Sequence, residues 1–273
     1  MHSEGKSSSS MKRLASAAVA LPLFVAYVYY LPPLPYFLAL LIAAGMAAMR
    51  EFFAMYRVSP VLNAAGVAAG GILLYIFCMY PDHALYGLVA GILALMMLRL
   101  LSTGTPSGSM SDMGPLGVGF LYIGGCMSFH WFLRNMHEAD GLKYIFSLYM
   151  SVWLADSLAY YIGTYLGRNK LCPSISPKKT VEGGLGSVLG GILGMTAAKV
   201  LFGIPGLSLY GAMATGALLG VTTLAGDLIE SMYKRDAGVK DSGSIMPGHG
   251  GILDRIDGML VSGPALYFIV RYF

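Results

Sequence analysis

The amino-acid sequence predicts an all-α polytopic membrane protein with about nine transmembrane helices. Of its 273 residues, 56% are hydrophobic and 12% are charged, whereas an ordinary soluble domain carries about twice that charged fraction. The apolar residues gather in windows close to the ~20 residues that a helix needs to cross a bilayer. The segments between the windows are rich in Pro, Gly and Ser, which are typical of turns. We therefore expect lipid to surround most of the chain.

Nine apolar windows follow one another along the chain. They lie near residues 14–30, 34–49, 61–80, 84–101, 114–133, 142–165, 184–203, 208–230 and 254–272. The first two are short, and the stretch LPPLP at 31–35 between them predicts either a tight turn or a broken helix. Clusters of Pro, Gly and Ser support the breaks at 104–115 and 171–187.

These windows divide the chain into three parts. We expect a disordered, Ser-rich tail over residues 1–10, five spans over 11–135, and four spans over 136–273 with cytoplasmic loops at 167–183 and 231–253. Several glycines fall at small-x-x-x-small spacing, including Gly186, Gly190 and Gly194. This spacing favours close packing of helices within one chain over a seam between two copies.

The basic residues predict how the chain crosses the membrane. With nine spans, fourteen of them share one side: Lys6, Lys12, Arg13, Arg50, Arg57, Arg99, Arg168, Lys170, Lys178, Lys179, Lys234, Arg235, Lys240 and Arg255. Four fall on the other side: Arg134, Lys143, Lys199 and Arg271. Cytoplasmic loops carry the excess of Lys and Arg. We therefore expect an integral protein of the cytoplasmic (inner) membrane, with a cytoplasmic N-terminus and an external C-terminus.

Acidic residues gather at the end of the predicted bundle. Asp156 lies in the sixth window, Asp227 and Glu230 close the eighth, and Asp254 and Asp257 open the ninth. An acid at membrane depth costs ~2.5 to 3.5 kcal/mol on insertion scales, so this gathering requires an explanation. Each pair is spaced i, i+3 and therefore shares one helix face. The sequence predicts a carboxylate-lined site suited to a hard cation such as Mg²⁺. The alternative is that these acids only pair with nearby Lys and Arg.

Two basic segments are expected to border this site. The first follows the eighth span, is rich in glycine and ends at the start of a helix. Backbone N–H groups in glycine-rich segments and at helix N-termini bind anions. The candidate residues of this segment are Lys234, Arg235, Lys240, Asp241, Gly248, His249, Gly250, Gly251 and Arg255. The second follows the sixth span, with the candidates Ser176, Lys178, Lys179, Thr180 and Glu182. Taken alone, the second segment also fits an ordinary positive-inside loop, and His249 also fits a structural hydrogen-bonding role.

Several familiar kinds of site are excluded by the sequence. No G-x-x-x-x-G-K-[ST] motif occurs, and no G-x-G-x-x-G follows a strand pattern, so a Walker-type or Rossmann nucleotide site is not expected. Cys78, Cys126 and Cys172 lie far apart without a neighbouring His. We therefore interpret them as free thiols.

The stretch from 231 to 257 carries a family resemblance. Its sequence is SMYKRDAGVKDSGSIMPGHGGILDRID, and it closely resembles the signature of the phosphatidate cytidylyltransferases, also called CDP-diacylglycerol synthases. Tyr233 and Met246 stand where smaller aliphatic residues are expected. The loop at 176–183 and the stretch WLADS at 153–157 also look like family features. The resemblance is good from about residue 150 onward, while the first half matches only as a string of apolar spans.

This resemblance implies an activity and a set of site residues. The family activates phosphatidic acid with CTP in phospholipid biosynthesis and releases pyrophosphate. The resemblance implies that the reaction requires Mg²⁺ and a second cation such as K⁺, and that the protein is a homodimer. We expect no nucleic-acid partner. Asp227, Asp254 and Asp257 are then expected at the metal. Catalytic roles are implied for the same acids and for Lys234, Arg235, Lys240, Asp241, His249 and Arg255. Substrate-binding roles are implied for Asp156, Ser176, Lys178, Lys179, Thr180, Glu182, Gly248, Gly250 and Gly251. Residues 136–273 would form the catalytic region.

Two other classes of protein compete with this interpretation. Another CTP-dependent enzyme, either a cytidylyltransferase for a different lipid phosphate or a lipid kinase, would use similar residues. An ion-coupled transporter would also place acids in the membrane. However, the two halves of the chain show no convincing similarity, and the acids crowd into its last third. The D-G-x-x-A-R motif of CDP-alcohol phosphatidyltransferases is absent.

Overall fold

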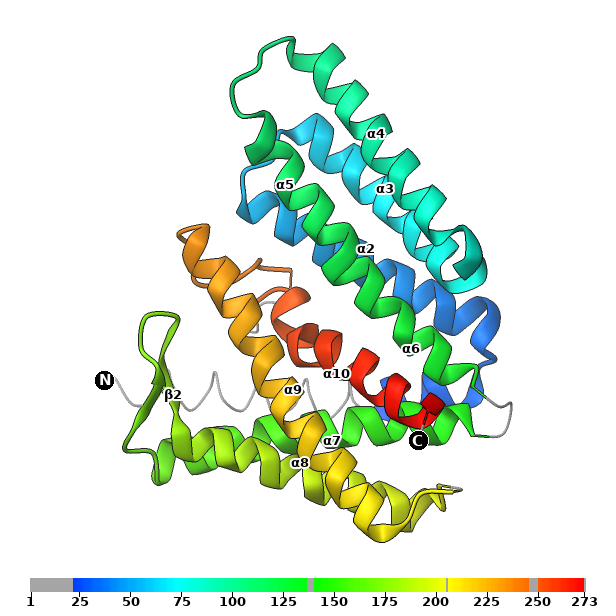
Figure 1. Ribbon diagram of the computed structural model, residues 1–273, viewed down its shortest axis with the longest axis vertical. Coiled ribbons are helices and arrows are strands. Elements are labelled where there is room, and N and C mark those ends of the chain that lie inside the picture. Colours follow the sequence, from blue (N-terminus) through cyan, green and yellow to red (C-terminus); the bar gives the residue numbers. More distant parts are fainter. Residues whose placement is uncertain (1–21, 137–139, 205, 246–249, 273) are drawn as a thin grey trace.

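The computed structural model describes residues 22–136, 140–204, 206–245 and 250–272. The described chain is almost entirely helical, with a single small hairpin (Figure 1). In order, the elements are the π-helix η1 (Pro33–Phe37), α2 (Leu38–Met55), α3 (Pro60–Met79), the 3-10 helix η2 (Pro81–His83), α4 (Ala84–Thr103), α5 (Ser109–Gly119), the π-helix η3 (Phe120–Gly125), α6 (Cys126–Arg134), α7 (Gly141–Tyr165), β1 (Lys170–Cys172), β2 (Ser176–Thr180), α8 (Val181–Phe202), α9 (Leu209–Asp236) and α10 (Leu253–Tyr272). The predicted all-α fold is confirmed.

The helices account for the predicted spans. Within the described residues, seven stretches are long and apolar enough to cross a membrane: Pro33–Met55, Pro60–Met79, Pro81–Thr103, Ser109–Arg134, Gly141–Tyr165, Val181–Phe202 and Leu209–Asp236. Helix α10 is also 20 residues long, but it carries charged residues near both ends. Of the first predicted window, residues 22–30 are helical, and its remainder lies with the predicted tail outside the described residues. The chain is therefore a polytopic membrane protein.

Local sequence explains where the helices around the site begin and end. The Thr180 side chain accepts a hydrogen bond from the Gly183 N–H (3.1 Å) and caps α8, and Ser208 caps α9 in the same way through the Gly211 N–H (3.0 Å). These bonds satisfy N–H groups that the first turn of a helix leaves without partners. Gly203 ends α8 at a positive φ of 61°, a conformation that glycine adopts without strain.

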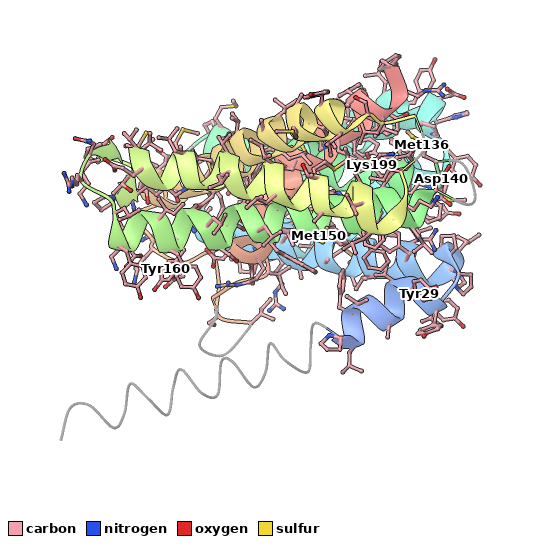
Figure 2. The ribbon with its side chains drawn as sticks, turned by 90° about the horizontal axis from the view of Figure 1, so that it is seen from below. Tyr29, Met136, Asp140, Met150, Tyr160 and Lys199 are labelled. Atoms are coloured by element: carbon pink, nitrogen blue, oxygen red, sulfur yellow. The ribbon has the colours of Figure 1, made fainter. Side chains whose placement is uncertain are left out.

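The turns between helices lie alternately on two sides of the molecule. In Figure 1, the α2–α3 and α4–α5 turns, the hairpin and the end of α9 lie on the left. On the right lie the α3–α4 turn, the end of α6, the start of α7, the end of α8 and the last turn of α10. Figure 2 shows Tyr160 and Asp140 at opposite ends of α7, with Lys199 of α8 near the Asp140 end. The two loops predicted to form the site therefore share one side.

Glycines bring the last helices into close contact. A Cβ on Gly190 of α8 would collide with the Leu154 carbonyl of α7, and one on Gly191 would collide with backbone at Gly216 and Gly220 of α9. Small residues at such crossings allow direct approach of helix backbones. The glycine spacing therefore serves packing within the chain, as expected.

The structure adds detail in the two predicted loops. The loop at 167–183 contains the antiparallel hairpin β1–β2, in which Lys170 lies opposite Thr180. Helix α9 continues to Asp236, so the second loop begins six residues later than the predicted 231. The helix extends because Lys234 forms ion pairs with Glu230 one turn earlier and with Asp254 of α10. Its charge is thereby neutralised within the bundle.

Candidate active site

A cavity of about 920 Å³ lies where α7, the hairpin, α8, α9 and the start of α10 meet. Twelve of the candidate residues from the sequence line it: Asp156, Lys178, Lys179, Thr180, Asp227, Lys234, Lys240, Asp241, Gly250, Asp254, Arg255 and Asp257. They come from five separate segments of the chain. The fold therefore gathers most of the predicted site around one space.

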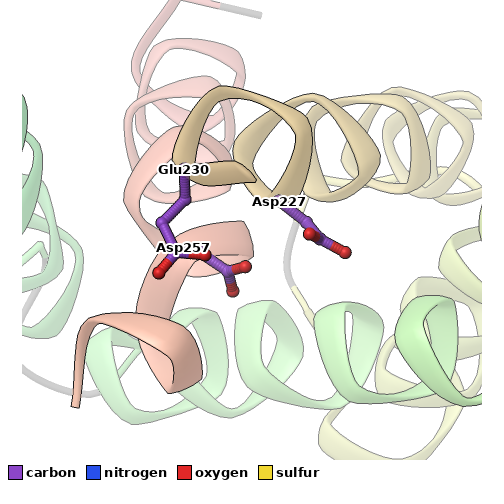
Figure 3. Close-up of side chains that lie close together, drawn as sticks. All are labelled: Asp227, Glu230 and Asp257. Carbon is purple, nitrogen blue, oxygen red and sulfur yellow. The ribbon is translucent and has the colours of Figure 1, made fainter. Parts of the chain in front are cut away.

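Three carboxylates form an acidic cluster on one wall of the cavity. Asp227 and Glu230 from α9 and Asp257 from α10 each offer an oxygen, and these oxygens lie within 4.8 Å of one another (Figure 3). The two helices approach closely here because Gly226 has no side chain, and a Cβ would overlap the Asp257 carbonyl. The i, i+3 spacing in α9 turns both of its acids toward α10.

The donor set of this cluster fits a hard divalent cation. All three groups are oxygen ligands, which Mg²⁺ and Ca²⁺ prefer. The Glu230 carboxylate is 1% exposed, and its Oε1 has no hydrogen-bond partner among the described residues. A buried carboxylate oxygen without a donor is costly, and a bound cation would remove that cost.

Two lysines contact the acids. Lys179 Nζ from β2 lies 2.7 Å from Asp227 Oδ2. Lys234 Nζ forms an ion pair with Glu230 and another, at 2.6 Å, with Asp254 Oδ1. Acidic and basic groups therefore alternate along the wall, which is the arrangement needed to hold both a cation and the phosphates bound to it.

Asp254 has a different set of partners from the acidic cluster. Its Oδ2 accepts hydrogen bonds from the Gly251 N–H (2.8 Å), the Ser242 N–H (3.1 Å) and the Ser242 hydroxyl (3.0 Å). It thus ties the segment before α10 to Lys234. Its expected role as a metal ligand remains a prediction.

Some candidate residues hold the frame of the site. Arg235 donates to the carbonyls of Ile175 (3.1 Å) and Val239 (3.0 Å) and so joins the hairpin to the end of α9. The Glu182 carboxylate accepts from the Arg168 N–H (3.0 Å) and from the side chain and backbone of Asn169.

Four candidates remain, and two of them lie among the described residues. Ser176 begins β2 opposite Cys172, and Gly251 packs against Ser242 and Glu51. Gly248 and His249 lie outside the described residues.

The sequence placed Glu230 among the acids of the predicted carboxylate-lined site but gave it no role as a metal ligand, and it did not point to Glu51 at all. Glu51 of α2 is 4% exposed and accepts bonds from the backbone at the start of α10. The available signal was an acid at the end of an apolar window, and the adjacent Arg50 makes that end look like an ordinary interfacial boundary.

Comparison with known proteins gives a consistent result. Residues 11–273 match the family described as the cytidylyltransferase family. The phosphatidate cytidylyltransferase of Bacillus subtilis is 36% identical over 260 residues, covering 92% of this chain and 93% of that protein. The protein of the same name from Staphylococcus aureus (strain COL) is 32% identical over 83% of this chain and 86% of its own length. The Synechocystis protein of that name is 48% identical over 134 residues, covering 48% of this chain and 44% of its own length.

Proposed function

Because the chain belongs to the cytidylyltransferase family, we propose that it transfers the cytidylyl group of CTP to phosphatidic acid, forming CDP-diacylglycerol and pyrophosphate. The chain is a nucleotidyltransferase. One structural observation supports the chemistry: a cavity in a membrane-embedded bundle has three clustered carboxylates and five basic residues on its walls, namely Lys178, Lys179, Lys234, Lys240 and Arg255. The basic groups can bind the phosphates of an anionic lipid headgroup and of a nucleoside triphosphate, and the acidic groups can bind the cation between them.

The proposed reaction is a direct displacement at phosphorus. An oxygen of the lipid phosphate bonds to the α-phosphorus of CTP, and the bond from that phosphorus to the bridging oxygen breaks. Pyrophosphate leaves with the bonding electrons. The attacking phosphate is already an anion near neutral pH, so no general base has to remove a proton. Catalysis then rests on positioning the reactants and neutralising their charge.

The residues of this chain divide those tasks between them. Lys179, Lys234 and Lys240 come from three separate elements and line the same cavity, so they would contact phosphate oxygens from different directions. Asp227, Glu230 and Asp257 would hold a Mg²⁺ ion, and the ion would neutralise charge on the phosphates. Asp156 lines the cavity from α7 and is proposed to border the bound substrate, and a second cation such as K⁺ is proposed beside Mg²⁺.

We propose the inner membrane as the setting of the reaction. The chain is an integral membrane protein, and the relatives named above come from bacteria. We place it in the inner membrane with the N-terminus and the cavity on the cytoplasmic side, where CTP is available. A homodimer is proposed as its state, and chemical cross-linking in native membranes would test that.

The activity is tested by the products formed from CTP. Purified protein in detergent should release pyrophosphate when CTP and phosphatidic acid are both present, and should release little when either is omitted. Diacylglycerol in place of phosphatidic acid is the matched control, because a CTP-dependent lipid kinase would form CDP and no pyrophosphate. Dependence on a different lipid phosphate would identify another cytidylyltransferase, and lack of any CTP turnover would contradict the proposal.

A further inference from the structure

Glu51 lies outside the cavity, yet it contacts the segment that forms one wall. It is on α2, in the half of the chain that carries few charges, and it is 4% exposed. Its Oε1 accepts a hydrogen bond from the Ile252 N–H (3.0 Å), and its Oε2 accepts from the Leu253 N–H (2.9 Å) and the Ser242 hydroxyl (3.2 Å). A side chain from one helix therefore caps the start of another.

These contacts are specific for a carboxylate at this position. The first N–H groups of a helix have no partner within the helix and carry partial positive charge, so a buried anion is stabilised there. The backbone at Gly243 and Gly251 also lies directly against the Glu51 carboxyl, and a Cβ at either position would collide with it. Both glycines therefore allow Glu51 to approach the backbone.

A single hydroxyl connects Glu51 to the acids of the site. Ser242 Oγ lies 3.2 Å from Glu51 Oε2 and 3.0 Å from Asp254 Oδ2. Its one proton can be donated to only one of these carboxylates at a time. Asp254 in turn binds Lys234, which pairs with Glu230 of the acidic cluster. A continuous polar network thus runs from α2 to that cluster.

Helix α2 also contacts the other end of the same segment. The Tyr56 hydroxyl donates to Asp236 Oδ2 (2.9 Å) at the end of α9, and the rings of Phe52 and Tyr233 lie 5.3 Å apart. Both ends of the segment 237–252 are therefore attached to one helix of the N-terminal half. Within the described residues, that segment contributes Lys240, Asp241, Gly243, Ser244 and Gly250 to the cavity wall.

We propose that Glu51 is a positioning residue for cytidylyl transfer, which fixes the start of α10 and the segment before it so that Lys240 and Arg255 contact the nucleotide phosphates while Asp254 holds Lys234 in place. Glu51 does not line the cavity, so it acts through Ser242 and the backbone. This inference rests on the proposed function. It assigns a task to the N-terminal half, which otherwise provides only apolar spans.

Three variants test the inference. Glu51→Gln replaces one carboxylate oxygen by an NH₂ group. At least one of the N–H or O–H groups that donate to Glu51 then faces another donor and loses its hydrogen bond. Glu51→Asp keeps the charge, but its shorter side chain does not reach the backbone. Both should raise the KM for CTP roughly tenfold or more, the size of effect expected when buried polar groups lose their partners. Ser242→Ala removes only the connection to Asp254 and should have a smaller effect.

A matched control separates positioning from stability. Asp112 accepts a 2.6 Å bond from the largely buried Arg99 and is 18% exposed, in the α4–α5 region away from the cavity. Asp112→Asn should lower thermal stability while leaving the KM for CTP unchanged. If Asp112→Asn and Glu51→Gln raise that KM equally at equal loss of stability, Glu51 is only structural and the inference is wrong.

Hydrogen–deuterium exchange provides a readout independent of turnover. In Glu51→Gln, exchange in peptides covering 240–245 and 250–255 should increase roughly tenfold, because the local opening free energy falls. The same peptides should be unchanged in Asp112→Asn. Unchanged exchange in Glu51→Gln would overturn the inference even if activity fell. If wild-type protein releases no pyrophosphate, the proposed function fails, while the exchange data still decide whether Glu51 holds the segment.

Discussion

Lys179 Nζ lies 2.7 Å from Asp227 Oδ2 and joins the β1–β2 hairpin to the acidic cluster on α9 and α10. A residue expected to bind phosphate is therefore paired with a residue expected to bind metal. A cation bound by Asp227 would repel this ammonium group. The Lys179 ammonium would then turn from Asp227 toward a phosphate oxygen when CTP and the metal enter together.

The first prediction follows from this competition between Lys179 and the metal. Asp227→Asn and Asp257→Asn each remove a charged oxygen from a hard cation, so the Mg²⁺ concentration for half-maximal pyrophosphate release should rise by about tenfold or more, roughly 1.4 kcal/mol. Lys179→Ala should lower that concentration while raising the KM for CTP. Mg²⁺ titrations in matched detergent measure both effects. Identical Mg²⁺ curves for all four proteins would show that the acids only form ion pairs.

The second prediction concerns Asp254, whose role as a metal ligand is open. Its oxygens bind Lys234, Gly251 and Ser242. If positioning is its only task, Asp254→Asn should lower the turnover number and leave the Mg²⁺ curve in place. If it also binds metal, the curve should shift as it does for Asp227→Asn. Either result comes from the same titration, and wild-type behaviour in both respects would remove Asp254 from the site.

Hydropathy was sufficient to predict the helices but not the polar contacts between them. Eight of the nine windows coincide with described helices because each apolar run is long. The β1–β2 hairpin was not predicted, since its strands are short and polar. The charges of Lys234 and Arg235 suggested a loop. The chain remains helical there because Lys234 is neutralised by Glu230 and by Asp254 of another helix.

The candidate site shows the same limit. Spacing along α9 placed Asp227 and Glu230 on one face, and the order of the spans brought α10 beside them. The bonds from Ile252 and Leu253 to Glu51 join residues about 200 positions apart. Such a contact depends on how the two halves pack together, and no local pattern in the sequence specifies that packing.

The third prediction distinguishes Lys240 and Arg235, two basic residues for which the sequence predicts the same role. Lys240 lines the cavity, so Lys240→Ala should raise the KM for CTP with little change in thermal stability, because a solvated loop charge contributes little to folding. Arg235 instead holds the carbonyls of Ile175 and Val239, so Arg235→Ala should lower both activity and stability. Thermal unfolding and CTP titration of both variants are the measurements. Full activity in both variants would show that these basic residues only set the orientation of the chain in the membrane.

The fourth prediction concerns orientation. The loops at 104–108 and 166–180 lie on the same side of the molecule as the end of α9 (Figure 1), and the excess of basic residues predicts that this side is cytoplasmic. Single cysteines at Ser107 and Lys178, in a background without the three native cysteines, should react with an impermeant thiol reagent only after the cells are opened. Labelling of intact cells would reverse both the orientation and the side from which CTP enters.

The last prediction tests the close approach of α9 and α10 at Gly226. A Cβ at this position would overlap the Asp257 carbonyl, and overpacking of this kind costs about 1 to 3 kcal/mol. Gly226→Ala should therefore separate the two helices, move Asp257 away from Asp227, and lower both thermal stability and pyrophosphate release. Gly117→Ala in α5 is the matched control, since a Cβ there meets no heavy atom within 4 Å and alanine favours a helix. The control should be as stable as wild type or more so, with full activity. If Gly226→Ala behaves like the control, the spacing of α9 and α10 does not set the geometry of the carboxylates.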